Sequence, residues 1–125
     1  MNKKQIFIVE GDRMLAERIK QNLEAEQYRV DVFYQGNNAI LALKAKWVDL
    51  IITSITLQGS MNGIQFLQEI KKHGDFQKIP VIVQTSKINM KKMVDHFKVD
   101  FFITKPYQMF DLIEQVNNIL HSKTK

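Results

Sequence analysis

Short apolar runs alternate along the chain with stretches in which apolar residues recur every three or four positions. The apolar runs lie at residues 6–9, 30–33, 50–52, 81–83 and 101–103. Except for the second, they are almost continuously apolar, as is typical of parallel strands covered on both faces of a sheet. The second run alternates apolar and polar residues, which predicts a strand nearer an edge.

Helical periodicity fills the intervals between these runs. Leu15, Ile19 and Leu23 recur at helical spacing after Asp12, whose side chain is suited to cap a helix N-terminus. The apolar stripes of the other predicted helices are Ala39, Ile40 and Leu43, after Gly36-Asn37-Asn38; Ile64, Leu67 and Ile70; Met90, Met93, Val94 and Phe97; and Met109, Ile113, Val116 and Leu120. Residues 121–125 are expected to form a frayed tail.

This alternation predicts five βα units, with connections long enough for right-handed crossovers. The expected fold is an α/β, doubly wound, three-layer sandwich, in which a five-stranded parallel sheet is flanked by five helices. We expect one domain over residues 1–125, with a core at about 5–120 and no output domain. Function in such a fold belongs at the carboxyl ends of the strands. Those ends are residues 10–12, 54, 84–86 and 104–106.

The composition narrows the chemistry. The 125-residue chain is 45% hydrophobic, enough to bury a single core. It has no cysteine, which excludes disulfides, thiolate metal sites and a cysteine nucleophile. No apolar stretch approaches the ~18 residues of a membrane span, and none suits a signal peptide, so we expect a cytoplasmic protein without membrane association. The three histidines lack the spacing of metal ligands, and none is assigned to a metal.

The formal net charge of +5 comes entirely from residues 71–98, which hold seven lysines and two aspartates. Such a segment is either a solvated face or a docking surface for an acidic protein partner, and the sequence leaves both open. The lysines assigned to the docking surface are Lys87, Lys91, Lys92 and Lys98. Nucleic acid is disfavoured, because the segment has no arginine and the chain shows no helix-turn-helix or aromatic-plus-basic platform. Trp47, before a strand, is expected to cover an edge of the core.

The predicted strand ends contain the motifs IFIVEGD, DLIITSITLQGSMNG, IPVIVQTS and FFITKPY. In this order and spacing they resemble the receiver domains of bacterial two-component response regulators, over about residues 5–120. The resemblance implies a flavodoxin-like fold and a pocket at the carboxyl edge. In that pocket an aspartate ending the third strand accepts a phosphoryl group from a histidine kinase, and two acidic residues after the first strand hold Mg²⁺. A Thr or Ser and a Lys contact the phosphoryl oxygens.

Part of this pattern is present here. Thr85 and Lys105 occupy the positions that contact the phosphoryl group, and Pro106 follows as in the family. Phe102 takes the aromatic position that reports activation, although its simplest role is packing. Thr85 either hydrogen-bonds locally or responds to a ligand. Lys98 stands near where receivers have a glycine, so the fourth helix needs another C-cap.

The rest of the pattern is lost. The acidic pair is Glu10 and Gly11, the acceptor position is Ser54, and the loop QGSMNG is one residue longer than usual and lacks its customary proline. A serine hydroxyl is not ionised at neutral pH and needs a base, for which Glu10 is the only candidate. Glu10 is expected to pair with Lys105, and Asp12 fits a helix cap better than a metal ligand. We therefore expect weak or absent Mg²⁺ binding, no other cofactor and no enzymatic activity.

These residues favour a stand-alone receiver-like protein that acts as a protein-interaction module without aspartyl phosphorylation. One alternative is a phosphoacceptor of altered chemistry, in which a Ser/Thr kinase modifies Ser54. A further alternative is a small-ligand or nucleotide binder that uses the strand-end hydroxyls, although the first βα loop presents acids where phosphate binders present glycines and amides. Because receivers commonly pair or engage targets through the fourth helix, fifth strand and fifth helix, a homodimer through that face is also open.

Overall fold

The computed structural model describes residues 3–121, in which strands and helices alternate as the sequence predicts. The strands are β1 (Gln5–Val9), β2 (Arg29–Phe33), β3 (Leu50–Ser54), β4 (Val81–Thr85) and β5 (Phe101–Thr104). The helices are α1 (Arg13–Ala25), α2 (Gly36–Leu43), α3 (Gly63–Lys72), α4 (Lys91–Asp95) and α5 (Met109–His121), with 3₁₀ turns at Phe76–Lys78 and Ile88–Met90. No helix within these residues has the length and apolar character needed to span a membrane.

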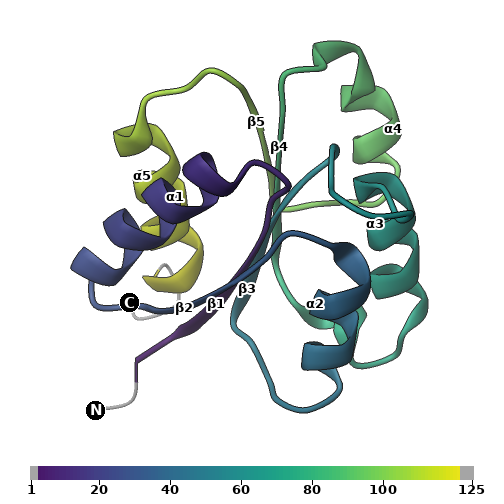
Figure 1. The fold of residues 1–125 in the computed structure, drawn as a ribbon, viewed down its shortest axis with the longest axis horizontal. Helices are drawn as coiled ribbons and strands as arrows, with labels where there is room; N and C mark the ends of the chain where they lie inside the picture. The colour runs from purple at the N-terminus through teal and green to yellow at the C-terminus, as the bar shows by residue number, and fades with distance from the viewer. Residues whose placement is uncertain (1–2, 122–125) are drawn as a thin grey trace.

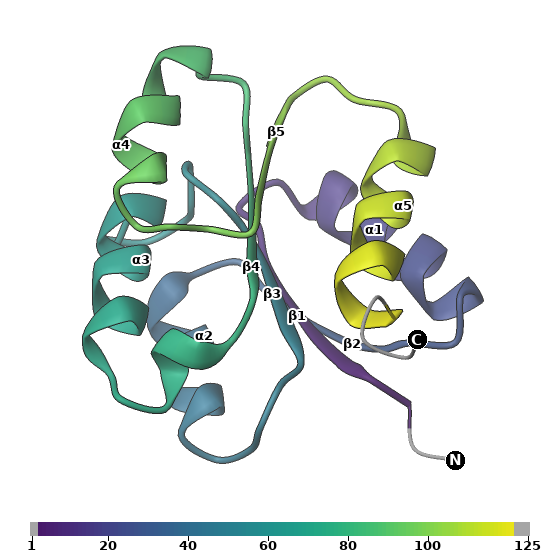
Figure 2. The same ribbon diagram turned by 180° about the vertical axis from the view of Figure 1, so that it is seen from behind.

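The strands form one parallel sheet in the order β2-β1-β3-β4-β5. The predicted fold is confirmed: the sheet lies between two helical layers, with α1 and α5 on one face and α2, α3 and α4 on the other (Figures 1 and 2). Strand β2 is at an edge, as its alternating sequence predicts. Strand β5 forms the other edge and is only partly buried, although its side chains contact both cores: Phe102 packs on the side of α2, α3 and α4, and Phe101 and Ile103 pack on the side of α1 and α5.

Each face of the sheet has its own core, because successive strand residues point to opposite sides. In β1, Phe7 and Val9 pack toward the layer of α2, α3 and α4, whereas Ile6 and Ile8 pack toward α1 and α5. All of these side chains are fully buried. Strands β3 and β4 are buried along their whole length, which explains why they appear in the sequence as continuous apolar runs.

The fourth helix departs most from the prediction. Only residues Lys91–Asp95 are α-helical, and the expected apolar stripe is incomplete because the side chain of Met93 is 50% exposed. Val94 is buried, with Met90 and Phe97 packed partly against the core. The C-cap of α4 is His96, and two residues later Lys98, at the position where a glycine was missing, adopts a left-handed backbone with φ 55° before the chain enters β5.

Two element boundaries also differ from the expectation. Helix α2 begins at Gly36 rather than after the Gly36-Asn37-Asn38 segment, because Gln35 takes the extended N-cap conformation and is bridged to Gln58 of the loop after β3. The expected tail at 121–125 is partly helical, since His121 is the last residue of α5. The remainder of that tail, residues 122–125, lies outside the described residues.

The loop after β3 returns very close to that strand. The backbone N–H of Gly63 donates to the carbonyl of Ile55 at 2.7 Å, which fixes the start of α3 against the end of β3. A Cβ atom at position 63 would lie 2.1 Å from the carbonyl oxygen of Ser54 and 2.5 Å from the Cα of Ile55. The close approach therefore needs glycine at this position.

We expect Gly63→Ala to destabilise the folded state by about 1–3 kcal/mol, because backbone atoms cannot yield as a flexible side chain would. Urea unfolding measures the change in the free energy of unfolding. Gly74→Ala is the matched control, since nothing lies within 4 Å of its Cβ position. That variant should stay within about 0.5 kcal/mol of the parent chain. Equal stability of the two variants would show that the loop can retreat from β3.

Candidate functional site

The sheet brings the predicted strand-end residues together at its carboxyl edge. Ser54 ends β3 and lies beside Gln84 of β4 in the strand register, while Glu10 follows β1 and Lys105 follows β5. The side chains of Glu10 and Ser54 are almost completely buried, with 2% and 1% of each residue exposed. Four neighbouring strands therefore contribute to one polar cluster beneath the surface.

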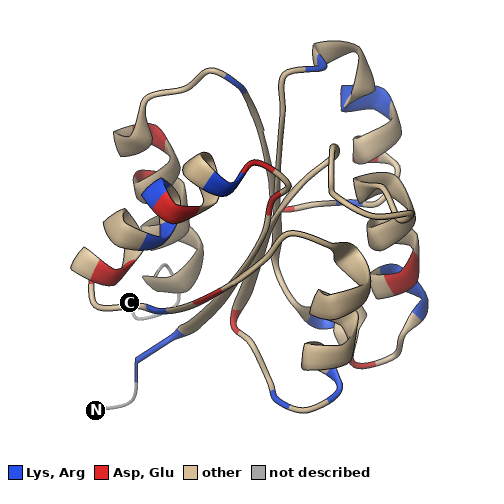
Figure 3. Ribbon diagram, in the orientation of Figure 1, with Lys and Arg blue, Asp and Glu red and all other residues tan. Residues whose placement is uncertain are grey.

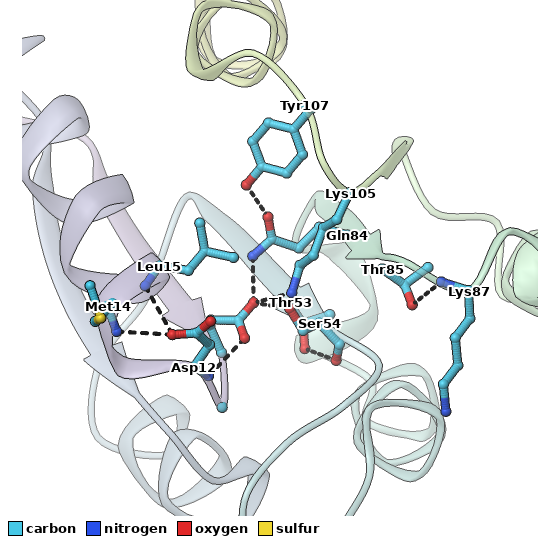
Figure 4. Close-up of polar contacts among 12 residues, drawn as sticks. Asp12, Met14, Leu15, Thr53, Ser54, Gln84, Thr85, Lys87, Lys105 and Tyr107 are labelled. Atoms are coloured by element: carbon cyan, nitrogen blue, oxygen red, sulfur yellow. Dashed lines mark hydrogen bonds and ion pairs between the residues drawn. The ribbon is translucent and has the colours of Figure 1, made fainter.

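The carboxylate of Glu10 is the centre of this cluster, and Figure 4 labels its partners Ser54, Gln84 and Lys105. Its Oε1 atom accepts hydrogen bonds from the hydroxyl of Ser54, from Nε2 of Gln84 at 2.9 Å and from Nζ of Lys105 at 2.9 Å. Its Oε2 atom accepts from the backbone N–H of Asp12 at 2.9 Å. The predicted ion pair between Glu10 and Lys105 is confirmed, with the lysine side chain 22% exposed.

Asp12 turns away from the cluster and caps α1. Its Oδ1 atom accepts from the backbone N–H groups of Met14 at 3.0 Å and Leu15 at 3.2 Å. These are two of the N–H groups that a helix N-terminus leaves without an internal partner. The structure thus confirms the capping role expected for Asp12, and leaves Glu10 as the carboxylate that enters the cluster.

Two members of the site, Tyr107 and Gln84, were not assigned to it from the sequence, although Gln84 is among the strand-end residues named there. The hydroxyl of Tyr107, on the loop between β5 and α5, donates to Oε1 of Gln84, which in turn donates to Glu10. Burial, with a smaller contribution from the charge of Glu10, raises the pKa of Tyr107, so its phenol remains a donor. Gln84 directly follows an apolar run, which could have indicated a buried polar side chain that needs a hydrogen-bond partner. That its partner is Tyr107 could be found only from the tertiary structure.

The loop after β3 occupies the space beside Gly11. A Cβ atom at this position would lie 3.1 Å from the carbonyl oxygen of Thr56 and 3.2 Å from the Cα of Leu57. Gln58 holds the loop there: its side chain donates to the carbonyl of Gly11 at 2.8 Å, and its backbone N–H donates to the carbonyl of Tyr34 at 3.0 Å. The side of the pocket where the resemblance places the second acidic residue is thus filled by backbone.

Other predicted site residues lie apart from the cluster. The hydroxyl of Thr85 accepts from the backbone N–H of Lys87 at 3.1 Å, the local bond that was one of its two expected roles. Phe102 is partly buried and packs against the core beneath α2, α3 and α4. Pro106 follows Lys105 through a cis peptide bond and is exposed.

The lysines assigned to a docking surface divide into two groups. Lys87, Lys91 and Lys92 surround the start of α4, where basic positions are visible in Figure 3, and Lys91 pairs with Asp95 at 3.0 Å. Lys98 instead lines a hollow between the end of α4 and the C-terminal half of α3. We use "α4 lysine surface" below for Lys87, Lys91 and Lys92 only.

The donor set at the carboxyl edge is poor in charge for a divalent cation. One carboxylate enters the cluster, and both of its oxygens already accept hydrogen bonds from protein groups. Mg²⁺ is bound in proteins through carboxylates and substrate phosphates that replace part of its water shell. Within residues 3–121 no group of three or more His, Asp and Glu side chains is arranged to hold a metal ion.

A doubly wound parallel sheet with its polar residues collected at the carboxyl edge defines a class of α/β signalling and nucleotide-binding modules. Within that class, residues 6–117 match the family model of the response regulator receiver domain. The chain is 30% identical over 118 residues to response regulator ArlR of Staphylococcus aureus, an alignment that covers 93% of this chain and 52% of that protein. The chain therefore belongs to the response regulator receiver domain family, and it spans about half the length of the curated relatives it matches.

Solved structures agree with this assignment. The receiver domain of a signal transduction histidine kinase from Syntrophus aciditrophicus superimposes with a TM-score of 0.87 at 29% identity, over 98% of this chain and 93% of that one. The receiver domain of a sensor histidine kinase from Pseudomonas aeruginosa, solved with a magnesium ion in its active-site cleft, shares the fold with a TM-score of 0.85 at 18% identity. That alignment covers 95% of this chain and 98% of the other chain.

We predict that Lys105→Met destabilises the protein by about 2–4 kcal/mol, because it leaves the carboxylate of Glu10 buried without its counter-ion. Urea unfolding measures the loss. The control is Lys46→Met, which breaks the exposed pair between Lys46 and Asp31 at 3.1 Å and should cost about 0–1 kcal/mol.

A double variant separates the lost pair from lost packing. Adding Glu10→Gln to Lys105→Met removes the unpaired charge, so the double variant should be more stable than Lys105→Met alone. If Lys105→Met proves as mild as Lys46→Met, or if the double variant is no better, the pair does not stabilise this edge of the sheet.

Proposed function

We propose that this chain is a cytoplasmic, non-enzymatic receiver module of two-component signalling that acts by binding a protein partner, without aspartyl phosphorylation. The observation that supports the proposal most directly is the state of Glu10. Its carboxylate is buried, paired with Lys105, and hydrogen-bonded by the hydroxyl of Ser54. The position where a receiver needs an ionised nucleophile is therefore held by a neutral donor.

The proposal includes weak or absent Mg²⁺ binding. The cation would have to displace Lys105 from Glu10 and would find neither a second carboxylate at Gly11 nor one at Ser54. The loop held by Gln58 also lies against Gly11 on that side. Without a cation and without an ionised acceptor oxygen, attack on a phosphohistidine is strongly disfavoured.

The partner would engage the α4 lysine surface. Four ion pairs occur in the described part of the chain, and neither Lys87 nor Lys92 belongs to any of them. Their charges therefore remain available to a partner. The side chain of Ile88, between them in the chain, is 68% exposed and adds an apolar contact. Basic side chains around an exposed apolar residue suit a partner with acidic groups around an apolar anchor. Homodimerisation through α4, β5 and α5 would use the same region.

Phosphorylation of Ser54 by a Ser/Thr kinase is the second candidate, and one contact favours it. The hydroxyl of Ser54 donates to Glu10, the arrangement of a nucleophile beside a base. Two observations weigh against it. The accepting oxygen is shared with Lys105 and Gln84, and Ser54 is too deeply buried for a kinase to reach without local opening.

Binding of a small ligand at the carboxyl edge ranks third. A hollow of about 380 Å³ lies between the start of α1 and the loop after β5. Its lining includes Lys105 and Arg18, which favour an anion, but also Asp12 at the helix N-terminus where a phosphate would otherwise bind. The capping carboxylate thus occupies the backbone donors that such a ligand needs.

We expect no labile phosphoryl adduct on the protein after incubation with acetyl phosphate and Mg²⁺, as judged by intact mass. The matched variant combines Gly11→Asp with Ser54→Asp and restores both missing carboxylates. It should take up phosphate, provided that the loop at Thr56 shifts by a few tenths of an ångström to admit the new Cβ. Labile phosphate on the unaltered chain would contradict the proposal, and acid-stable phosphate on Ser54 in protein recovered from cells would favour the kinase alternative.

Reversal of the α4 lysine surface should abolish partner capture. The triple variant Lys87→Glu, Lys91→Glu and Lys92→Glu should lose a partner that the parent chain retains from cell extract, because acidic groups would meet repulsion. The control reverses the exposed basic residues Lys3, Lys4 and Arg29, which line neither proposed docking surface, and gives the same change in net charge elsewhere. Loss of the partner in both variants would indicate a non-specific charge effect rather than a docking surface.

A further inference from the structure

An apolar hollow with a basic rim lies at the amino-terminal edge of the sheet, remote from the Glu10 cluster. Its volume is about 540 Å³. The segment after α2 forms one wall and the 3₁₀ turn at Phe76–Lys78, with the residues beside it, forms the other. The lining residues are Leu43, Lys44, Ala45, Lys46, Trp47, His73, Asp75, Phe76 and Ile79.

The floor of this hollow is apolar and firmly placed. Leu43, Phe76 and Ile79 belong to the core and are nearly inaccessible to water. The ring of His73 stacks on Phe76 with centroids 4.3 Å apart, which holds the wall of the hollow in position. An apolar depression of this size has room for one or two large side chains of a partner.

Trp47 does not cover the core edge as the sequence suggested. It is 56% exposed and lines the hollow. The helix before it is also unusually apolar for a surface helix: residues 39–43 are apolar without interruption, and Leu41 is 64% exposed. Exposed tryptophan beside an apolar depression is the composition found at the centre of protein interfaces rather than on a solvated face.

The rim is basic. Lys44 and Lys46 lie on the segment between α2 and β3, and His73 lies across the hollow. Asp75 is the one acidic residue of the lining. Lys46 forms an ion pair with Asp31, which lies outside the lining, at 3.1 Å. Lys44 belongs to none of the four ion pairs in residues 3–121. The lining therefore holds two lysines, one of them paired with Asp31, against one aspartate, and Lys44 favours a partner whose apolar anchor is flanked by carboxylates.

We propose that this hollow, with Trp47 at its wall, is a second docking site that takes an acidic amphipathic helix of a partner protein. The inference deepens the proposed interaction role, since it names a contact surface separate from the α4 lysine surface. A helix with Leu or Phe on one face would insert an apolar side chain above Phe76. Its glutamates would then meet Lys44 and Lys46 at the rim.

The chain has a single tryptophan, so its fluorescence reports this site directly. The probe is a synthetic 18-residue amphipathic peptide with Leu and Phe on one helical face and Glu on the other, and its counterpart has every Glu replaced by Lys. The acidic peptide should shift the emission of Trp47 saturably, and the lysine peptide should not. A shift with both peptides, or with neither, overturns the proposal.

Variants locate the binding. Ala45 is exposed, and the tyrosine of Ala45→Tyr would fill the hollow. This variant should bind the acidic peptide about tenfold more weakly or worse, as measured by calorimetry. Lys44→Glu reverses the rim and should also weaken it, whereas the matched reversal Lys92→Glu should leave affinity within about twofold. Urea unfolding confirms that each variant is folded. If Lys92→Glu weakens the peptide and Lys44→Glu does not, the hollow is not the docking site, while the proposed role of the α4 lysine surface survives.

Two further measurements test the identity of the occupant. Sedimentation of the chain alone should show a monomer. A dimer that Ala45→Tyr dissociates would show that a second copy of the chain occupies the hollow, and would overturn the proposal. Vesicles of anionic phospholipid should leave the Trp47 emission unchanged at physiological salt. A shift with vesicles that Lys44→Glu removes would assign the basic rim to a membrane surface and overturn the proposal.

Discussion

The contact between the carboxylate of Glu10 and the ammonium of Lys105 determines what the carboxyl edge of this sheet can do. The two groups come from opposite ends of the chain and meet at 2.9 Å, with Glu10 almost completely buried. A buried carboxylate is tolerable only when its charge is balanced and its lone pairs are satisfied. Lys105 balances the charge, and Ser54, Gln84 and the backbone of Asp12 complete the hydrogen bonding.

This closed network shows how the fold accommodates a serine at position 54 and a glycine at position 11. Every buried side-chain nitrogen and oxygen in residues 3–121 has a hydrogen-bond partner, so the altered pocket imposes no unsatisfied polar group on the fold. The loop after β3 packs against Gly11 and links the pocket wall to β2 through Gln58. Ser54 and Gly11 are therefore accommodated by hydrogen bonds and by packing.

Much of the site was predictable from residue type and position, and the misses have identifiable physical causes. The ion pair, the capping role of Asp12 and the local bond of Thr85 follow from short-range or strand-end geometry. Tyr107 was missed because its contact with Gln84 depends on how the loop after β5 folds back. The exact extent of α4 was not predictable from the sequence, because apolar spacing predicts which residues can face the core, not how many remain helical once Lys98 turns the chain.

The sequence by itself determined the fold class, the order of the elements and the neutral character of the acceptor position. These depend on the periodicity of apolar residues and on the absence of a carboxylate, and both are local properties of the chain. Only the tertiary structure decided that β5 is an edge, that a loop fills the space beside Gly11, and that Trp47 stands beside an apolar hollow. Each of these results from contacts between segments far apart in sequence, which no local pattern encodes.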